Sequence, residues 1–410
     1  MDVNDVVVIG GGQAGFQVCA SLRDNDFHGR LTLVCGEKVM PYQRPPLSKG
    51  YLSGDADIAL RPDSYYGSHD IAVVENSVTS IDRVGHKVIL DNGRQLPYDR
   101  LVLATGARPR MLPVPGSRLN GVLALRTLVD AHSLRRQLEA SRRLVVIGGG
   151  FIGLEVAASA RKLGLKVTVI ESLGRTMARA VSSEMSSYLT REHCRQGTTV
   201  LLGRMVTAFD GDSTGHVRKV VLDDGSRMEA DLVVVGVGVV PNVELAVAAG
   251  LPVDNGIVVD EFLRTADEAI FAIGDCANYP SAHANYQRVR LESVQNAVDQ
   301  GHCVAANILG RAAKYVAVPW FWSDQHGVKL QIAGISTGYD HAVVTGDPET
   351  GKFSVFCFRR SRLVAVESAN KPADHVLARR MLAGEPDLSP EEVAHPDFDL
   401  KTRQRQKQPA

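Results

Sequence analysis

The sequence predicts an α/β protein in which one βαβ unit occurs twice and is followed by a separate α+β domain. The main observation is an internal repeat. Val7 to Arg23 recurs at Val145 to Arg161, 138 positions further on, with eleven of seventeen residues identical. The two stretches read VVIGGGQAGFQVCASLR and VVIGGGFIGLEVAASAR. Each begins as a short apolar strand, passes through a glycine turn and opens a helix. The second observation is the alternating apolar pattern beyond Pro319, which is typical of a small sheet.

Both repeats carry the motif G-x-G-x-x-G between the strand and the helix. The glycines are Gly10, Gly12 and Gly15 in the first copy, and Gly148, Gly150 and Gly153 in the second. In a Rossmann-like unit the first glycine makes a tight turn, the second lets the backbone approach a pyrophosphate, and the third lets helix and strand pack closely. Two such motifs in strand–turn–helix context predict two dinucleotide-binding domains. We expect them to bind a flavin and a nicotinamide, and therefore to perform redox chemistry.

The bulk properties indicate a multidomain globular protein, because 410 residues are too many for one core. Lys+Arg and Asp+Glu are both 46, so no net field favours nucleic acid or a membrane surface as a partner. The first strand begins within about five residues, which leaves no room for a signal peptide and predicts a cytoplasmic protein. The longest apolar run, Leu232 to Val240, is too short to span a bilayer. The cysteines and histidines show no metal-ligand spacing, so no metal is expected.

The remaining elements are expected in the following order. The first unit continues with strands at Leu31 to Cys35, Ala72 to Val78, Lys87 to Leu90 and Arg100 to Ala104, and with a loop with helical ends at Pro41 to Leu52. A Pro-rich stretch, Ala107 to Gly116, predicts a crossing to the second unit, which occupies Asn120 to Val240 and leaves through GVGVVPN. Strands at Ile257 to Asp260 and Ala269 to Asp275 and a helix at Leu291 to Leu309 follow.

The C-terminal domain is expected to be a sheet with a helix after it. Its strands are predicted at Leu330 to Ala333, Ala342 to Val344, Phe353 to Phe358 and Leu363 to Ser368, and its helix at Asp374 to Leu382. The tail KTRQRQKQPA, which is residues 401–410, is charged and lacks periodicity. We therefore expect it to fray.

A carboxylate at the end of the second strand of a Rossmann-like unit accepts the ribose hydroxyls of the adenosine. In the second copy this residue is Glu171, which ends KVTVIE. At ~5 Å and an effective dielectric of ~20, Glu171 would repel a 2′-phosphate by roughly 3 kcal/mol. NADH should then be preferred over NADPH by on the order of a hundredfold, and Arg175 softens this preference without reversing it. In the first copy the counterpart is expected at Gly36 or Glu37, and Glu37 is the predicted ribose ligand.

Two further motifs carry a resemblance to a known family. TADEAIFAIGDCA, from Thr265 to Ala277, resembles the second flavin motif of the two-dinucleotide flavoproteins, in which the Asp binds the ribityl chain of FAD. ATGARP, from Ala104 to Pro109, resembles the chain crossing of the same family. The resemblance implies a glutathione-reductase-like arrangement, with an FAD-binding domain in two segments, 1–112 and 245–318, an NADH-binding domain at 113–244 and a C-terminal domain at 319–410.

The loop PYQRPPLSKGYL lacks the cysteines of the dithiol and single-cysteine branches of this family. It resembles instead the ferredoxin reductases that serve oxygenases, the group of putidaredoxin reductase, rubredoxin reductase and the biphenyl dioxygenase reductase component. GGGFIGLEVAA, GVGVVPN, RLESVQNA and PWFWSDQ agree with that group. Gly36 departs from it, because relatives often carry Asp there. The resemblance covers residues 6 to 380.

This resemblance implies the cofactor-binding residues. Those for FAD are Gly10, Gly12, Ala14, Gly15, Glu37, Arg44, Lys49, Val78, Ala104, Thr105, Gly106, Arg126, Asp275, Val294, Trp320 and Trp322. Those for NADH are Gly148, Gly150, Phe151, Ile152, Gly153, Glu155, Glu171 and Gly238.

It also implies the reaction, a hydride transfer from NADH to FAD followed by single-electron transfers to an iron–sulfur partner. Lys49 is expected near the flavin ring, where an ammonium stabilises the negative charge of the reduced form. Glu155 is expected to pair with Lys49 and to face the nicotinamide. Trp320 and Trp322 lie two residues apart in a strand and therefore point the same way. Trp322 is favoured at the electron exit, and core packing is the alternative for both tryptophans.

The expected partner is an acidic two-iron, two-sulfur ferredoxin that serves a bacterial haem monooxygenase and binds transiently. Candidate docking residues are Arg311, Lys314, Arg359, Arg360, Arg362, Arg379 and Arg380. The chain is expected to be a monomer or a weak homodimer. Two alternatives stay open: a rubredoxin reductase or another NADH-dependent flavin reductase, and a redox sensor like apoptosis-inducing factor. The short connections between units favour the electron-transfer enzyme.

Overall fold

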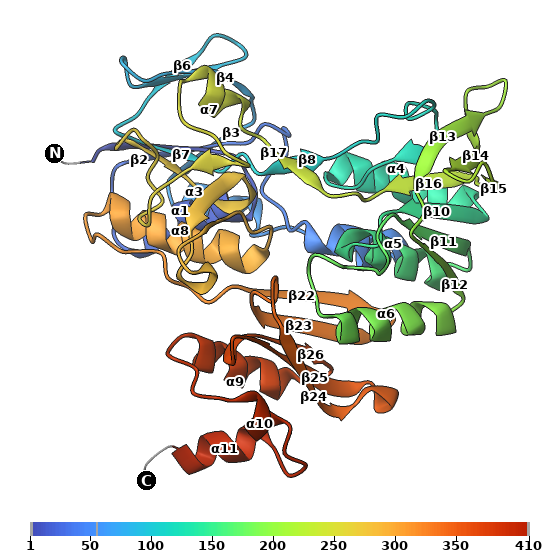
Figure 1. The fold of residues 1–410 in the computed structure, drawn as a ribbon. Coiled ribbons are helices and arrows are strands. Elements are labelled where there is room, and N and C mark those ends of the chain that lie inside the picture. The colour runs from blue at the N-terminus through green and yellow to red at the C-terminus, as the bar shows by residue number, and fades with distance from the viewer. Residues whose placement is uncertain (1–2, 55, 408–410) are drawn as a thin grey trace. The chain divides into compact units, whose positions relative to one another are not determined.

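The computed structural model describes residues 3–54 and 56–407 (Figure 1). The chain forms two compact units, each assembled from three segments. Unit 1 comprises Met1–Gln43, Asp57–Arg108 and Val240–Pro319, and unit 2 comprises Arg44–Ala56, Pro109–Val239 and Trp320–Ala410. The predicted fold class, α/β with two Rossmann-like domains and a C-terminal α+β domain, is confirmed.

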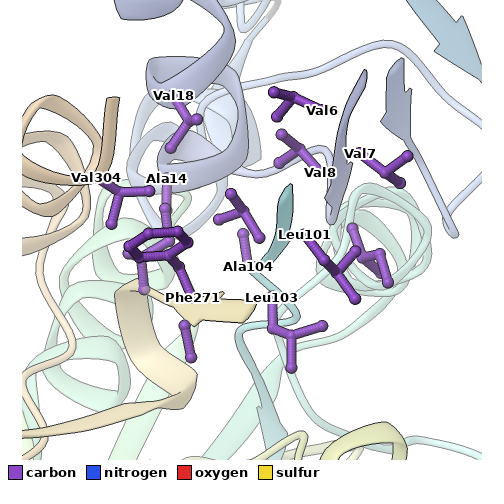
Figure 2. Packing of buried hydrophobic residues seen from close by; sticks show 14 of the residues in the cluster. Val6, Val7, Val8, Ala14, Val18, Leu101, Leu103, Ala104, Phe271 and Val304 are labelled. Carbon is purple, nitrogen blue, oxygen red and sulfur yellow. The ribbon is translucent and has the colours of Figure 1, made fainter. Parts of the chain in front are cut away.

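A five-stranded parallel sheet forms the centre of unit 1, in the order β19-β7-β1-β2-β3. Its strands are β1 (Asp5–Ile9), β2 (Arg30–Val34), β3 (Ile71–Val74), β7 (Arg100–Leu103) and β19 (Ile270–Ala272). Their apolar runs are nearly continuous because a parallel sheet is covered on both faces. Helices α1 (Gln13–Asp24) and α8 (Val294–Ile308) pack against each other. Figure 2 shows Ala14, Val18 and Val304 of these helices in one buried cluster with Phe271 of β19.

Smaller elements complete unit 1. An antiparallel sheet contains β4 (Val78–Asp82), β5 (Lys87–Leu90) and β6 (Gln95–Pro97), and a second small sheet contains β18 (Ile257–Val258), β20 (Ala277–Pro280) and β21 (Arg288–Val289). The short helices are α3 (Asp63–Ser68), α7 (Glu244–Ala248) and the 3-10 turns η2 (Gly274–Cys276) and η3 (Ala282–Ala284). Strand β8 (Ala107–Pro109) pairs with β17 (Val239–Pro241) where the chain passes between the units.

Unit 2 repeats the parallel sheet in the order β12-β11-β10-β16-β9. The strands are β9 (Val122–Leu123), β10 (Arg143–Ile147), β11 (Lys166–Glu171), β12 (Thr198–Leu202) and β16 (Leu232–Val235), and the helices are α4 (Leu128–Ala140), α5 (Phe151–Lys162) and α6 (Ser183–Arg195). Helix α4 begins with a capping box, because Thr127 accepts from the backbone of Asp130 and the Asp130 side chain accepts in return. A small antiparallel sheet contains β13 (Val206–Gly211), β14 (Val217–Leu222) and β15 (Arg227–Glu229).

The loop segment of unit 2 forms η1 (Pro45–Ser48) and α2 (Gly50–Ser53). Its C-terminal part is an antiparallel sheet in the order β22-β23-β26-β25-β24, shown in orange in Figure 1. The elements are β22 (Trp320–Gln325), β23 (Val328–Gly334), β24 (His341–Asp347), the 3-10 turn η4 (Pro348–Thr350), β25 (Lys352–Arg359), β26 (Arg362–Ala369), α9 (Pro372–Leu382), α10 (Pro390–Val393) and α11 (Leu400–Lys407). Phe353, Phe356 and Phe358 of β25 are buried, and α9 packs on β26 and β23.

The expectation that the tail frays is wrong for residues 401–407, and residues 408–410 lie outside the described part. Residues 400–407 form α11, which is held by Arg403. The Arg403 side chain is buried and forms ion pairs with Glu392 and Asp387, at 2.5 and 3.3 Å. The helix is therefore anchored by the buried Leu400 and by the ion pairs of Arg403, and hydrophobic patterning does not register the ion pairs.

Several element boundaries also differ from expectation, including the following three. The strand expected over 72–78 is two strands, β3 and β4, which belong to different sheets. Helix α8 begins at Val294 because the Ser293 side chain caps it by accepting from the backbone of Asn296. Strand β19 ends at Ala272, and the 3-10 turn η2 follows it. Within residues 3–54 and 56–407, no helix is long and apolar enough to cross a bilayer.

Candidate active site

The first glycine turn, in unit 1, has the shape that a bound pyrophosphate requires. Gly10 has a φ of +119°, and a Cβ placed there would lie 2.1 Å from the carbonyl oxygen of Ala104. A Cβ at Gly15 would lie 2.0 Å from the carbonyl oxygen of Gly10. A Cβ at Gly12 would meet nothing within 4 Å. The outer glycines are thus fixed by contact with the protein, whereas the middle one borders open space at the start of α1, where a dinucleotide fits.

The second glycine turn, in unit 2, has the same geometry. A Cβ at Gly148 would lie 2.4 Å from the carbonyl oxygen of Gly236, and a Cβ at Gly153 would lie 2.2 Å from that of Gly148. Gly150 again borders open space, with nothing within 4 Å of its Cβ position. Phe151 and Ile152 open α5 next to this space. The residues of both turns therefore fit a dinucleotide each, one in each unit.

Glu171 is held at the second turn by two backbone donors. Its Oε2 accepts from the N–H of Gly149 and its Oε1 from the N–H of Leu173, both at 2.8 Å. Arg175 donates to the backbone carbonyls of Ala178, Val181 and Ser182, at 2.8 to 3.2 Å. The carboxylate is therefore held at Gly149, in the middle of the glycine turn, and the guanidinium of Arg175 is engaged with the backbone.

The register expected for the first copy is wrong. In the strand pairing, Ile147 faces Ile170 in the second copy, and Ile9 faces Val34 in the first. The residue in register with Glu171 is therefore Cys35, and not Gly36 or Glu37. The reason is that the insertion in the first copy is two residues long, since 34 − 9 exceeds 170 − 147 by two. Glu37 is exposed two residues further on, and its Oε2 accepts from Tyr42 Oη at 2.5 Å.

The Gly274-Asp275 motif forms the 3-10 turn η2 after β19. Gly274 has a φ of +73°, and its N–H donates to Oε1 of Gln300 at 2.7 Å. Gln300 is fully buried on α8. A buried amide therefore fixes the turn that presents Asp275, and the sequence motif gave no sign of this side chain.

Other predicted FAD residues of unit 1 lie at strand ends and helix starts. Ala104, Thr105 and Gly106 follow β7, and the Thr105 hydroxyl donates to the carbonyl of Asn242 at 2.7 Å. Val78 opens β4 and Val294 opens α8.

Lys49 and Glu155 form an ion pair in unit 2, with Nζ 2.8 Å from Oε2. Lys49 follows η1, and Glu155 lies on the first turns of α5, where it is only 2% exposed. Two further side chains hold the carboxylate. Ser48 donates to Oε2 at 2.5 Å and Ser323 of β22 donates to Oε1 at 2.6 Å. Sequence reasoning did not find either serine. Their only signal was proximity to Lys49 and Trp322 in the motifs that contain them.

The two tryptophans lie on β22 with ring centroids 5.5 Å apart, and both are half-buried. The guanidinium of Arg379 stands over Trp320, 4.6 Å from the ring centroid. His375 meets the edge of the same ring, and burial, with Arg379 nearby, lowers the pKa of His375 to about 4. The Trp320 ring therefore contacts both the guanidinium of Arg379 and the neutral imidazole of His375.

The remaining predicted residues are placed as follows. In unit 2, Arg44 donates to the carbonyl of Arg126 at 2.9 Å, and Gly238 has a φ of +100°. Of the docking candidates, Arg311 donates to the Asn25 side chain and Lys314 pairs with Glu261 in unit 1. Arg359 donates to the carbonyls of Thr337 and Gly338 in unit 2. Arg360, Arg362 and Arg380 also belong to unit 2.

The fold and the two glycine turns define the class of protein. Residues 4–301 match the family described as pyridine nucleotide-disulphide oxidoreductase, and residues 320–403 match the family described as reductase C-terminal. The chain belongs to the pyridine nucleotide-disulphide oxidoreductases, which are oxidoreductases that use FAD and NAD(P)H.

The relatives that match most of the chain are named as reductases of ferredoxin, rhodocoxin and putidaredoxin. The chain is 53% identical over 403 residues to rhodocoxin reductase of Rhodococcus erythropolis, covering 97% of this chain and 93% of the relative. A solved ferredoxin reductase from Rhodopseudomonas palustris is similar with a TM-score of 0.95 at 47% identity, covering 98% of this chain and 100% of that one. A solved putidaredoxin reductase, in its covalent complex with putidaredoxin, gives a TM-score of 0.95 at 40% identity over 99% of each chain. The predicted family resemblance is therefore confirmed.

Proposed function

We propose that this chain is an FAD-containing NADH:ferredoxin reductase, which passes electrons from NADH one at a time to a two-iron, two-sulfur ferredoxin. The ferredoxin would in turn reduce an oxygenase, which we propose to be a bacterial haem monooxygenase. The observation that carries the proposal is the pair of glycine turns with the same geometry, each with an open middle glycine. We place the FAD-binding domain at 1–112 and 245–318, the NADH-binding domain at 113–244 and the C-terminal domain at 319–410.

The residues of the chain orient the cofactors and supply charge. When bound, NADH supplies a hydride, and FAD accepts it and releases electrons singly. The turn of Gly10 and Gly12, together with Asp275, would hold FAD. The turn of Gly148 and Gly150, together with Glu171, would hold NADH. Lys49, whose charge is balanced by the buried Glu155, would stabilise negative charge on the flavin ring.

The proposed preference for NADH follows from Glu171. Its carboxylate is bound to the N–H of Gly149 in the glycine turn, and Arg175, the nearest cation in sequence, donates to backbone carbonyls. A 2′-phosphate would therefore meet the negative charge of Glu171, while the guanidinium of Arg175 is already bound to the backbone.

The first experiment is a stopped-flow reduction of the purified holoenzyme with NADH and, in parallel, with NADPH, followed at the flavin absorbance band. We expect fast bleaching by NADH and bleaching slower by roughly a hundredfold by NADPH at equal subsaturating concentrations. Multiple turnover with a two-iron, two-sulfur ferredoxin then completes the test. A long-lived reduced complex that changes its oligomeric state would instead indicate a redox sensor. Turnover with rubredoxin alone would indicate a rubredoxin reductase.

The role of Lys49 is tested by Lys49→Met. The substitution keeps most of the length of the side chain and removes its charge, so we expect flavin reduction by NADH to be slower. An unchanged rate removes Lys49 from the mechanism. Ser48, its neighbour, is not suitable as a control because it binds Glu155. Lys371→Met is suitable, since Lys371 pairs with Asp374 in the C-terminal domain.

The proposed partner is acidic and binds transiently. We also propose that the chain works in the cytoplasm as a monomer or weak homodimer. Arg360, Arg362 and Arg380 are the first docking residues to test by charge reversal. The rate of ferredoxin reduction should fall as salt rises, because exposed charges are screened over about 8 Å at physiological ionic strength. A rate independent of salt argues against electrostatic docking.

A further inference from the structure

A line of buried hydrogen bonds leads from Glu155 into the C-terminal sheet and back to α6. Ser323 Oγ donates to Oε1 of Glu155 at 2.6 Å. Gln325 Nε2 donates to Ser323 Oγ at 2.9 Å, and Gln325 Oε1 lies 3.0 Å from Nε2 of His193. All four residues are at most 2% exposed. We refer to Ser323, Gln325 and His193 as the Glu155 relay.

The carboxylate dictates the orientation of every group in the relay. A carboxylate paired with Lys49 only accepts, so the single proton of Ser323 points to Glu155. Ser323 Oγ can then only accept from Gln325, which places the amide NH₂ group toward the serine. The amide oxygen consequently faces His193, and Nε2 of His193 must carry the proton. Burial lowers the pKa of His193, in agreement with a neutral ring protonated on one nitrogen.

The two oxygens of Glu155 are held from opposite sides. Oε2 receives Ser48 and Lys49 from the η1 segment, and Oε1 receives Ser323 from β22. Without Ser323, Oε1 would lose its donor while remaining buried, and the carboxylate could rotate away from Lys49. A buried acceptor without a donor is unfavourable, so the carboxylate would move to a position where Oε1 finds another donor.

We propose that Ser323, Gln325 and His193 are positioning residues that fix the carboxylate of Glu155, so that the C-terminal sheet sets the geometry of the Lys49–Glu155 pair. This inference rests on the proposed function, because the pair acts in flavin reduction only if NADH is the donor. The C-terminal domain would thereby contribute to the reduction of the flavin by NADH, in addition to any contact that it makes with the partner.

The first test measures flavin reduction at saturating NADH in the holoenzyme by stopped flow. We expect Ser323→Ala to lower the rate constant about tenfold and to change the apparent Kd for NADH by less than about twofold. Ser323→Thr keeps the hydroxyl and should retain most of the rate. Ser354→Ala is the matched control, because Ser354 is also a buried serine of the C-terminal sheet but binds Ser368 and Asp374.

A double-mutant cycle shows whether Ser323 acts through Glu155. In the Glu155→Gln background, Ser323→Ala should cause no further loss of rate. An equal loss in both backgrounds, or no loss in the wild-type background, overturns the proposal. If NADH does not reduce the wild-type flavin at all, the proposed function has failed before any variant is compared.

The second test does not depend on activity. In holoenzyme with ¹⁵N-labelled histidine, two-bond ¹H–¹⁵N spectra report which ring nitrogen carries the proton, and His193→Asn assigns the resonance. We expect His193 to be protonated on Nε2 in the wild type. In Ser323→Ala the amide of Gln325 is no longer constrained, so the Nε2–H resonance should shift or the two tautomers should mix. Protonation on Nδ1 in the wild type, or an identical spectrum in Ser323→Ala, contradicts the relay.

Discussion

Glu367 gives the sharpest prediction of pH-dependent stability, because it is a carboxyl group buried between two parts of unit 2. It lies on β26 and is 0% exposed. Its oxygens accept from the backbone N–H of Ser182 at 2.9 and 3.0 Å, and from the Ser182 hydroxyl at 2.6 Å. Ser182 is also the N-cap of α6, where its hydroxyl oxygen accepts from the backbone of Met185. Glu367 thus connects the C-terminal sheet to the start of a helix in the second Rossmann-like domain.

The magnitude follows from its pKa. Burial raises the pKa of Glu367 from 4.5 to about 7, against the opposing effect of its hydrogen bonds with Ser182. Between these two values the folded state binds more protons than the unfolded state, so stability falls as pH rises through this window. The loss of stability caused by ionising Glu367 is complete above pH 7 and absent below pH 4.5. With about 1.36 kcal/mol for each unit of difference, the cost of ionising the buried group is roughly 3 kcal/mol.

The perturbation is Glu367→Gln, which keeps the shape of the side chain and cannot ionise. The stability of the variant relative to that of the wild type should rise by about 2.5 kcal/mol between pH 5 and pH 8. The assay is hydrogen exchange of the α6 peptide by mass spectrometry, with variant and wild type compared at each pH so that the intrinsic exchange rate cancels. Glu349→Gln is the control, since Glu349 pairs with Arg195 of the same helix but is exposed. A difference between variant and wild type that is the same at both pH values would refute the reasoning.

Two further predictions concern the glycine turn and the thiols. Gly10→Ala should unfold or distort unit 1 and abolish FAD retention, because the added Cβ would lie 2.1 Å from the carbonyl oxygen of Ala104. In contrast, Gly12→Ala should leave the circular dichroism spectrum unchanged and only weaken the retention of FAD during dialysis, because the Cβ position of Gly12 has no neighbour within 4 Å. Native protein should react quickly with about one equivalent of a thiol reagent, since Cys194 is exposed and Cys19, Cys35, Cys276, Cys303 and Cys357 are buried. Burial raises the pKa of Cys35 and Cys303 to about 12, and rapid labelling of either would show that unit 1 opens readily.

The elements that the sequence predicted well are those with a local cause. In each glycine turn the third glycine contacts the first, five positions earlier in the chain, and the parallel strands follow from continuous apolar runs. Lys49 and Glu155 were expected to pair only because a family resemblance placed them together. Ser48 and Ser323 carry no periodicity and lie 107 and 168 positions from Glu155, so nothing local identified them. The α11 helix was missed because the ion pairs of Arg403 with Glu392 and Asp387 leave no hydrophobic periodicity in the tail.

The internal repeat also shows how one position acquired a different role. Gln17 occupies in α1 the place that Glu155 occupies in α5. Its amide donates to Ser21 of its own helix at 3.1 Å, and its Cβ would lie 2.8 Å from a Cβ added at Gly301 of α8. In the first copy this helix face is therefore closed by a neighbouring helix that approaches through a glycine. In the second copy the same face carries a buried carboxylate with three side-chain donors. Since the glycine turns before both helices have the same geometry, the chemistry of the second copy depends on what contacts its helix, and Ser323 of β22 is one of those contacts.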